Sequence, residues 1–181
     1  MKLILLLLVL ALQTAWILGT TLVQERALAG GKLVLLETRP ADLRDLLRDD
    51  YVILNYKISD VALRLFSPAL TNELAPGETV YVALEPRGQF YEVVQASTHR
   101  ITPTEGQIVL KGHIRSWWNN AAQTTQHLDY GLERYYVREG TGNPRGKITV
   151  QAAVPESGQA RIEEVFVDGK PYSDAMKGAA R

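Results

Sequence analysis

The chain has 181 residues, which is enough for one anchor segment and one domain of ordinary size. Twenty basic residues balance twenty acidic ones, so no net field steers the protein toward nucleic acid, and a nucleic-acid partner is not expected. The absence of cysteine excludes disulfides, thiolate catalysis and cysteine-based zinc sites.

Residues 1–23 have the character of a membrane anchor or signal segment. From Leu3 to Val23 the chain is apolar apart from Gln13 and three threonines, and about 20 such residues span a bilayer as a helix. Lys2 precedes this segment, so the positive-inside rule places everything after Glu25 outside the cytoplasm, with membrane lipid around residues 3–23. Cleavage before Gly30, as for a signal peptide, is the alternative, and both readings export the remainder.

After a short linker at 24–31, the sequence predicts a β domain over residues 32–172. Apolar and β-branched residues alternate between turn signals, which predicts strands at Lys32–Thr38, Tyr51–Ile58, Thr79–Leu84, Phe90–Ala96, Gln107–Arg115, Tyr130–Val137, Lys147–Val154 and Ala160–Val167. Such short, regular strands predict an all-β fold, either an antiparallel sandwich or a partly open barrel. We also expect one short inserted helix between Ser59 and Leu74, a polar loop over 117–127 and a disordered tail over 173–181.

The strand predicted at Tyr51–Ile58 has two different faces. Side chains alternate between the two sides of a strand. One side carries Val52, Leu54, Tyr56 and Ile58, and the other carries Tyr51, Ile53, Asn55 and Lys57. The first set is the more apolar, so we expect it to face the core.

Two tyrosine-containing segments carry a resemblance to a known family. The first resembles the naming motif of the GDYXXLXY proteins through Asp50, Tyr51, Leu54 and Tyr56, with Asp49 where the motif has glycine. The connector from Pro40 to Asp45, the pair Lys111-Gly112 and the run from Tyr130 to Gly142 are similar to further segments of that family. The resemblance implies a bacterial, membrane-anchored, periplasmic β domain that is often linked to a polytopic membrane protein. It implies no reaction.

Glu133 and Arg134 are the central candidates for a polar site. On a continuous strand the two side chains face opposite sides, so each needs its own partner. A charge buried among tyrosines costs several kcal/mol unless it is paired. The expected partners are Asp50, Arg44 and Lys111, either in an ion-pair clasp between strands or in a ligand site. The candidate binding residues are therefore Asp50, Tyr51, Arg44, Lys111, Glu133, Arg134 and Glu139.

Other polar features point to no specific chemistry. The loop Glu139-Gly140-Thr141-Gly142 has no following Lys-Ser/Thr pair, so we interpret it as a turn and not as a phosphate loop. The three histidines, His99, His113 and His127, show no spacing typical of a metal site. We therefore expect no metal, no cofactor and no assigned catalytic residue.

The sequence as a whole favours an accessory or binding module that acts with an integral membrane partner in the cell membrane. The alternative is a cell-envelope hydrolase. Such an enzyme would need two of the carboxylates Asp50, Glu133 and Glu139 to converge in a cleft, with at least one raised pKa.

Overall fold

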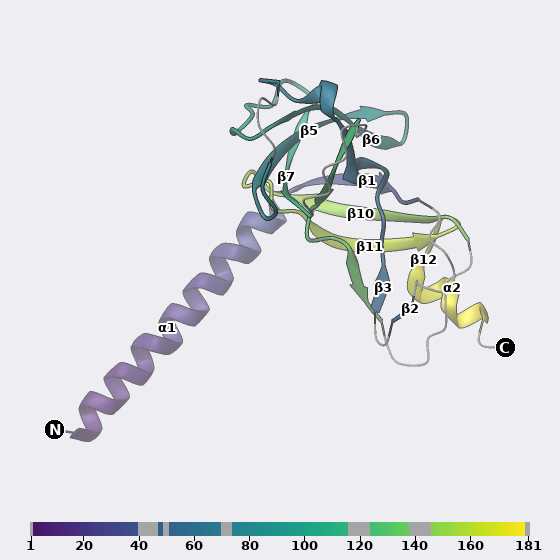
Figure 1. The fold of residues 1–181 in the computed structure, drawn as a ribbon. Coiled ribbons are helices and arrows are strands. Elements are labelled where there is room, and N and C mark those ends of the chain that lie inside the picture. The colour runs from purple at the N-terminus through teal and green to yellow at the C-terminus, as the bar shows by residue number, and fades with distance from the viewer. Residues whose placement is uncertain are drawn as a thin grey trace.

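A computed structural model describes residues 2–39, 47–48, 51–69, 74–115, 124–137 and 146–179 of the chain. It shows a long N-terminal helix, α1 (Lys2–Ala29), that extends away from a β domain (Figure 1). The named strands of the β domain all pair in antiparallel fashion, which confirms the all-β, antiparallel fold expected from the sequence.

The N-terminal segment differs from the prediction at its end. The expected linker over 24–31 is mostly helical, because α1 continues through good helix formers as far as Ala29. Within the part of the chain that is described, no helix is both long enough and apolar enough to cross a membrane. The span expected at residues 3–23 stays a prediction.

The first sheet has the most regular pairing in the domain. Its order is β1 (Lys32–Glu37), β10 (Ile148–Val154), β11 (Arg161–Val167) and β12 (Lys170–Pro171). β10 pairs with β1 on one side and with β11 on the other, and a β-bulge interrupts the second pairing at Gln151/Ala152. The short strand β12 reaches only the end of β11, at Phe166 and Val167.

Two further sheets complete the domain. The larger has the order β4 (Asp60–Ala62), β8 (Thr125–Asp129), β7 (Ile108–Ile114), β5 (Thr79–Arg87) and β6 (Phe90–Ser97). The smaller has the order β2 (Leu47–Arg48), β3 (Tyr51–Ile53) and β9 (Arg134–Tyr136). In Figure 1 the five-stranded sheet lies over β1 and β10, while β2 and β3 lie near β12 and the C-terminal helix.

One hydrophobic core joins the three sheets. Buried side chains from all of them belong to a single cluster, which includes Leu36, Leu54, Leu84, Leu110, Leu128, Tyr130, Val150 and Val165. The predicted core face of the 51–58 segment is confirmed, since Val52, Leu54, Tyr56 and Ile58 are only 1–4% exposed. Only Tyr51–Ile53 pairs as a strand, and the segment then continues into the 3-10 turn η1 (Lys57–Ser59).

The helix predicted between Ser59 and Leu74 is wrong for the described residues. This stretch contains β4 and a second 3-10 turn, η2 (Leu63–Leu65), and Asp60 is the first residue of a strand instead of a helix cap. Ser67 precedes Pro68, and a residue before proline disfavours the helical conformation. Residues 70–73 lie outside the described part.

Two other segments are more ordered than the sequence predicted. The end of the expected loop over 117–127 is strand, because β8 begins at Thr125 and pairs with both β4 and β7. The expected disordered tail is helical over most of its length, as α2 (Tyr172–Ala179). Tyr172 and Met176 are spaced one helical turn apart and are 4% and 7% exposed, so their burial holds this helix on the domain.

Candidate functional site: a pocket beside a tyrosine-rich turn

The segment predicted as one strand, Tyr130–Val137, is a turn followed by the short strand β9. Gly131 has φ of +79°, a conformation that glycine adopts readily, and β9 begins only at Arg134. Tyr130 and Leu132 still reach the core, whereas Arg134 is exposed. The expectation that both Glu133 and Arg134 are buried charges on opposite faces of one strand is therefore wrong.

Two buried tyrosines join this turn to the segment after β3. The Tyr56 hydroxyl donates a hydrogen bond to the carbonyl of Leu132 at 2.8 Å, and the Tyr130 hydroxyl donates to the carbonyl of Ile58 at 2.7 Å. The backbone N–H of Leu54 donates to the carbonyl of Glu133 at 2.8 Å. Each of the two segments, 54–58 and 130–133, thus donates hydrogen bonds to the other. We call this arrangement the tyrosine clasp.

The Glu133 side chain stabilises the turn by a hydrogen bond within it. Its carboxylate accepts a hydrogen bond from the backbone N–H of Tyr130 at 2.6 Å. Burial raises the pKa of Tyr56 and of Tyr130, and the negative charge of Glu133 raises both further. Both hydroxyls therefore stay protonated at neutral pH and remain hydrogen-bond donors to the carbonyls of the clasp.

Gly112 on β7 leaves the space that Tyr130 occupies. A Cβ atom at position 112 would lie 3.0 Å and 3.1 Å from two atoms of the Tyr130 ring, and 3.3 Å from the carbonyl oxygen of Asp129. The neighbouring Lys111 donates its backbone N–H to the carbonyl of Gly158 at 2.9 Å, which ties β7 to the β10–β11 turn. Gly112 thus leaves room for the Tyr130 ring, and the Lys111 backbone holds β7 to the β10–β11 turn.

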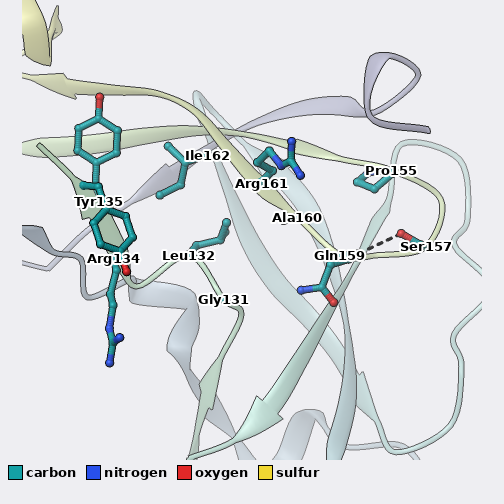
Figure 2. Close-up of a pocket in the computed structure, with 11 residues that line it drawn as sticks. Gly131, Leu132, Arg134, Tyr135, Pro155, Ser157, Gln159, Ala160, Arg161 and Ile162 are labelled. Carbon is teal, nitrogen blue, oxygen red and sulfur yellow. Dashed lines mark hydrogen bonds between the residues drawn. The ribbon is translucent and has the colours of Figure 1, made fainter. Parts of the chain in front are cut away.

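The turn and β9 form one wall of a pocket of about 720 Å3. The opposite wall comes from the β10–β11 turn and the start of β11 (Figure 2). Its floor is largely buried and mostly apolar, and comprises Leu132, Tyr135, Pro155, Ala160 and Ile162. Its rim is exposed and polar, and comprises Gly131, Arg134, Tyr136, Ser157, Gln159 and Arg161.

The charge of the pocket is positive. Arg134 and Arg161 stand at its rim, and its described lining holds neither a carboxylate nor a histidine. In Figure 2 the Arg134 guanidinium points down beyond the left end of the pocket, while Arg161 lies on the opposite wall above Ala160. A groove with an apolar floor and cationic rim suits a ligand that combines apolar groups with negative charge.

Arg134 also belongs to an aromatic surface on the outer face of β3 and β9. Its guanidinium carbon lies 5.4 Å from the ring centroid of Tyr51, a cation–π distance. Tyr51 is the cross-strand partner of Tyr136, and their ring centroids are 5.9 Å apart. Tyr136 is 70% exposed, so this face presents aromatic area and one cation beside the pocket.

The structure brings together only part of the predicted site. Tyr51, Glu133 and Arg134 cluster around β3 and the turn, while no ion pair joins Lys111 to Glu133 within the described chain. Arg44, Asp50 and Glu139 lie outside the described residues, so their pairings stay predictions. No sequence pattern singles out Gln159 or Arg161, because only the folding of the β10–β11 turn brings them to this wall.

A second polar cluster links β4, β7 and β8. His127 Nδ1 lies 2.6 Å from Asp60 Oδ1, and Arg39 pairs with the other oxygen of the same carboxylate. Arg115 Nε lies 2.8 Å from Asp129 Oδ1. Burial raises the pKa of Asp60, but the hydrogen bond with His127 and the charge of Arg39 outweigh it, so the net pKa is lowered. These carboxylates are ion-paired, and they serve as structural ties between strands.

Over the residues that the structure describes, no group of three or more histidine, aspartate and glutamate side chains is placed to hold a metal ion.

Fold and site together define an antiparallel β domain that follows a long helix and carries a cationic pocket beside a tyrosine-rich turn. GDYXXLXY proteins match residues 13–165, and the chain therefore belongs to the GDYXXLXY protein family. Neither the curated proteins nor the solved structures include a significant match. The family resemblance carried by Tyr51, Leu54 and Tyr56 is thereby confirmed.

Proposed function

We propose that this protein is a membrane-anchored, extracytoplasmic binding module whose pocket between β9 and β11 holds part of an integral membrane partner. The observation that carries the proposal is the pocket itself. Its volume of about 720 Å3 lies within the range of ligand sites, roughly 300–1,000 Å3. Its apolar floor and arginine-bearing rim provide both contact area and orientation for a bound group.

The rigid wall of the pocket supports a binding role. The tyrosine clasp fixes the turn 130–133, and Leu132 in the pocket floor accepts one of its hydrogen bonds through its carbonyl. Tyr135 packs edge-on against Tyr172 of α2, with ring centroids 5.5 Å apart. A site whose walls are held before the ligand arrives loses less conformational entropy on binding.

The anchor rests on the sequence of residues 3–23 and on the exposed apolar side chains of α1. Twenty-one residues of helix extend for about 30 Å, the thickness of a bilayer hydrocarbon core. Large side chains on several faces of α1 are 56–76% exposed, namely Leu6, Leu7, Leu10, Leu12, Trp16, Ile17 and Leu18. A helix that is apolar on all sides is suited to lipid and poorly suited to water.

The hydrolase alternative has less support among the described residues. The Glu133 carboxylate is engaged by the Tyr130 N–H, and the described pocket lining offers neither a carboxylate nor a histidine. Glycoside-type chemistry requires two carboxylates on either side of the scissile bond. We therefore favour the binding module.

Site-specific photocrosslinking in intact membranes tests the binding module. A photoreactive residue in place of Tyr136 should capture an integral membrane protein, because this side chain is exposed at the pocket rim. The matched control is the same residue in place of Arg87, whose side chain is 63% exposed on the distant β5–β6 hairpin.

The charge at the rim provides the second arm of this experiment. Arg134→Glu should abolish the product from position 136, since the reversed charge repels an acidic group on the partner. Equal capture from both positions, or capture that Arg134→Glu leaves unchanged, would reject the pocket as the binding site.

A further inference from the structure

The pocket lies beside a strand edge that no described strand covers. β11 pairs with β10 along its length on one side, but on the other side β12 reaches only Phe166 and Val167. The backbone groups of Arg161–Val165 on that side therefore have no strand partner among the described residues. Five residues of strand extend for about 17 Å, and α2, which follows β12, also contacts β11.

The edge and the pocket coincide in space. Arg161 and Ile162 belong to the first part of this edge, Ala160 directly precedes it, and all three line the pocket. The opposite wall is β9, which is itself the outer strand of the β2–β3–β9 sheet. A chain that lies in the pocket along β11 would thus meet backbone donors and acceptors on β11 and the side chains of Leu132 and Tyr135 below it.

We propose that the ligand of this pocket is an extended, acidic peptide segment that adds to the edge of β11 as a further strand. This inference rests on the proposed binding function and specifies its ligand class. Strand addition supplies affinity through main-chain hydrogen bonds and specificity through pockets for alternate side chains. β12 already occupies the same edge at the far end of β11, so a bound strand would extend the row that β12 begins.

The charges select an acidic segment. Arg161 stands at the pocket rim on the β11 wall, Arg134 stands at the end of the β9 wall, and the described lining carries no carboxylate. Farther along the edge lies exposed Glu163, at the register shift of β11 opposite Gln151/Ala152 of β10. Charges and bulges on an edge strand oppose pairing with another copy of the same chain. The arginines at the pocket rim favour a partner that carries carboxylates there.

The test uses the full-length protein in detergent micelles and a synthetic probe. The probe is a capped peptide of alternating valine and threonine with two glutamates. At a probe concentration ten times Kd, hydrogen exchange should slow about tenfold at those amides of Arg161–Val165 that point away from β10, because only the free protein exchanges there. A peptide with lysines in place of the glutamates should bind more weakly, as should the acidic probe with the Arg161→Glu variant.

Two controls isolate the backbone contribution. Alternate N-methylation of the probe, prepared in both registers, removes the donors that a strand needs, and one register should lose about five- to tenfold in affinity for each hydrogen bond lost. Arg87→Glu changes an exposed arginine far from the pocket and should leave probe binding unchanged. The thermal melts of both arginine variants should match the wild type, since both side chains are exposed.

The outcomes separate this inference from the function on which it rests. Equal binding of all N-methylated probes, or binding without slower exchange at Arg161–Val165, would overturn strand addition and leave a pocket bound through side chains. If the probe does not bind but crosslinking from position 136 is retained, the peptide ligand is rejected and the binding function stands. Loss of both results would reject the binding function as well.

Discussion

Gly112 on β7 and Tyr130, just after β8, depend on each other. The Tyr130 ring is fully buried and its hydroxyl is fixed on the Ile58 carbonyl, so the ring has little freedom to move away from position 112. The backbone oxygen of Asp129 closes the same space from another side. The glycine is therefore explained by side-chain packing and not by an unusual backbone angle.

Gly112→Ala should lower the free energy of unfolding by about 1–3 kcal/mol, the usual cost of forcing an extra methyl group into a packed core. Urea unfolding of the full chain in detergent measures this change. In a Tyr130→Leu background the same substitution should cost less, because the clashing ring is absent. Equal costs in both backgrounds would show that Tyr130 is not the group that excludes a methyl at this position.

The hydroxyls of the tyrosine clasp should contribute directly to stability. Tyr56→Phe and Tyr130→Phe each leave a buried carbonyl without its donor, so each should lower the free energy of unfolding by about 1–3 kcal/mol. Tyr172→Phe provides the contrast, because the buried Tyr172 hydroxyl has no hydrogen-bond partner among the described residues. That variant should be as stable as the wild type or more stable. Thermal melts in which all three variants behave alike would contradict the clasp.

The segment 51–58 and the segment 130–137 show what strand patterns in a sequence can and cannot predict. Alternation correctly identified Val52, Leu54, Tyr56 and Ile58 as core, even though pairing stops at Ile53, because an extended backbone keeps the same side-chain parity. In the second segment, Gly131 turns the chain and resets that parity. The sequence predicts which side chains share a face only while the backbone stays extended.

Short apolar stretches caused the other errors at this scale. The leucines between Ser59 and Leu74 suggested a helix, yet Val61 is fully buried within β4 and Phe66 forms a bridge to Ala96 on β6. Long-range pairing therefore overrides local propensity here. The C-terminal helix was missed for the opposite reason, since its only signal is the pair Tyr172 and Met176 one turn apart.

Glu37 on β1 links two other elements through charge. Its carboxylate lies 2.7 Å from Lys147 Nζ, just before β10, and 2.6 Å from Lys57 Nζ in η1. The hydrogen bonds from Lys147 and Lys57 lower the pKa of Glu37 below its ordinary value of 4.5. A lowered folded-state pKa contributes stability above the unfolded pKa, and this stability is lost as pH falls through the folded pKa.

Glu37→Gln should therefore reduce stability at neutral pH, and the difference from wild type should shrink below about pH 4.5. Urea unfolding midpoints at neutral pH and near pH 3 measure both effects. Glu92→Gln removes an exposed carboxylate on β6 and should show a much smaller change at either pH. A Glu37→Gln difference that grows on acidification would contradict the assigned ion pairs.

At the scale of the whole molecule, the pocket is a product of tertiary structure. Its walls come from residues 131–136 and 155–162. The first sheet and the backbone hydrogen bond from Lys111 to Gly158 bring these segments together. The sequence identified Arg134 because it lies in a recognisable motif. Arg161 lies in an ordinary strand pattern, and only the tertiary structure brings it to a pocket that β9 also lines.

Whether the pocket lies near a membrane surface depends on whether α1 is inserted in the membrane. Exposed apolar side chains such as Leu10 and Ile17, at 58% and 62%, are costly in water, and an uncleaved helix in lipid would remove that cost. We therefore expect the protein to remain in the membrane pellet after alkaline carbonate extraction, and N-terminal sequencing to find the segment 3–23 retained.

Charge substitutions in α1 provide the sharpest test of this expectation. The double variant Leu10→Arg and Ile17→Arg should appear in the soluble extract, because each arginine at the centre of a span costs about 2.5–3.5 kcal/mol. Leu63→Arg introduces the same charge at an exposed position on η2 and should leave the protein in the pellet. A mature chain that starts at Gly30 would instead identify a cleaved signal peptide. In that case the pocket would belong to a freely diffusing exported domain, and its partner would have to be reached without the help of a shared membrane.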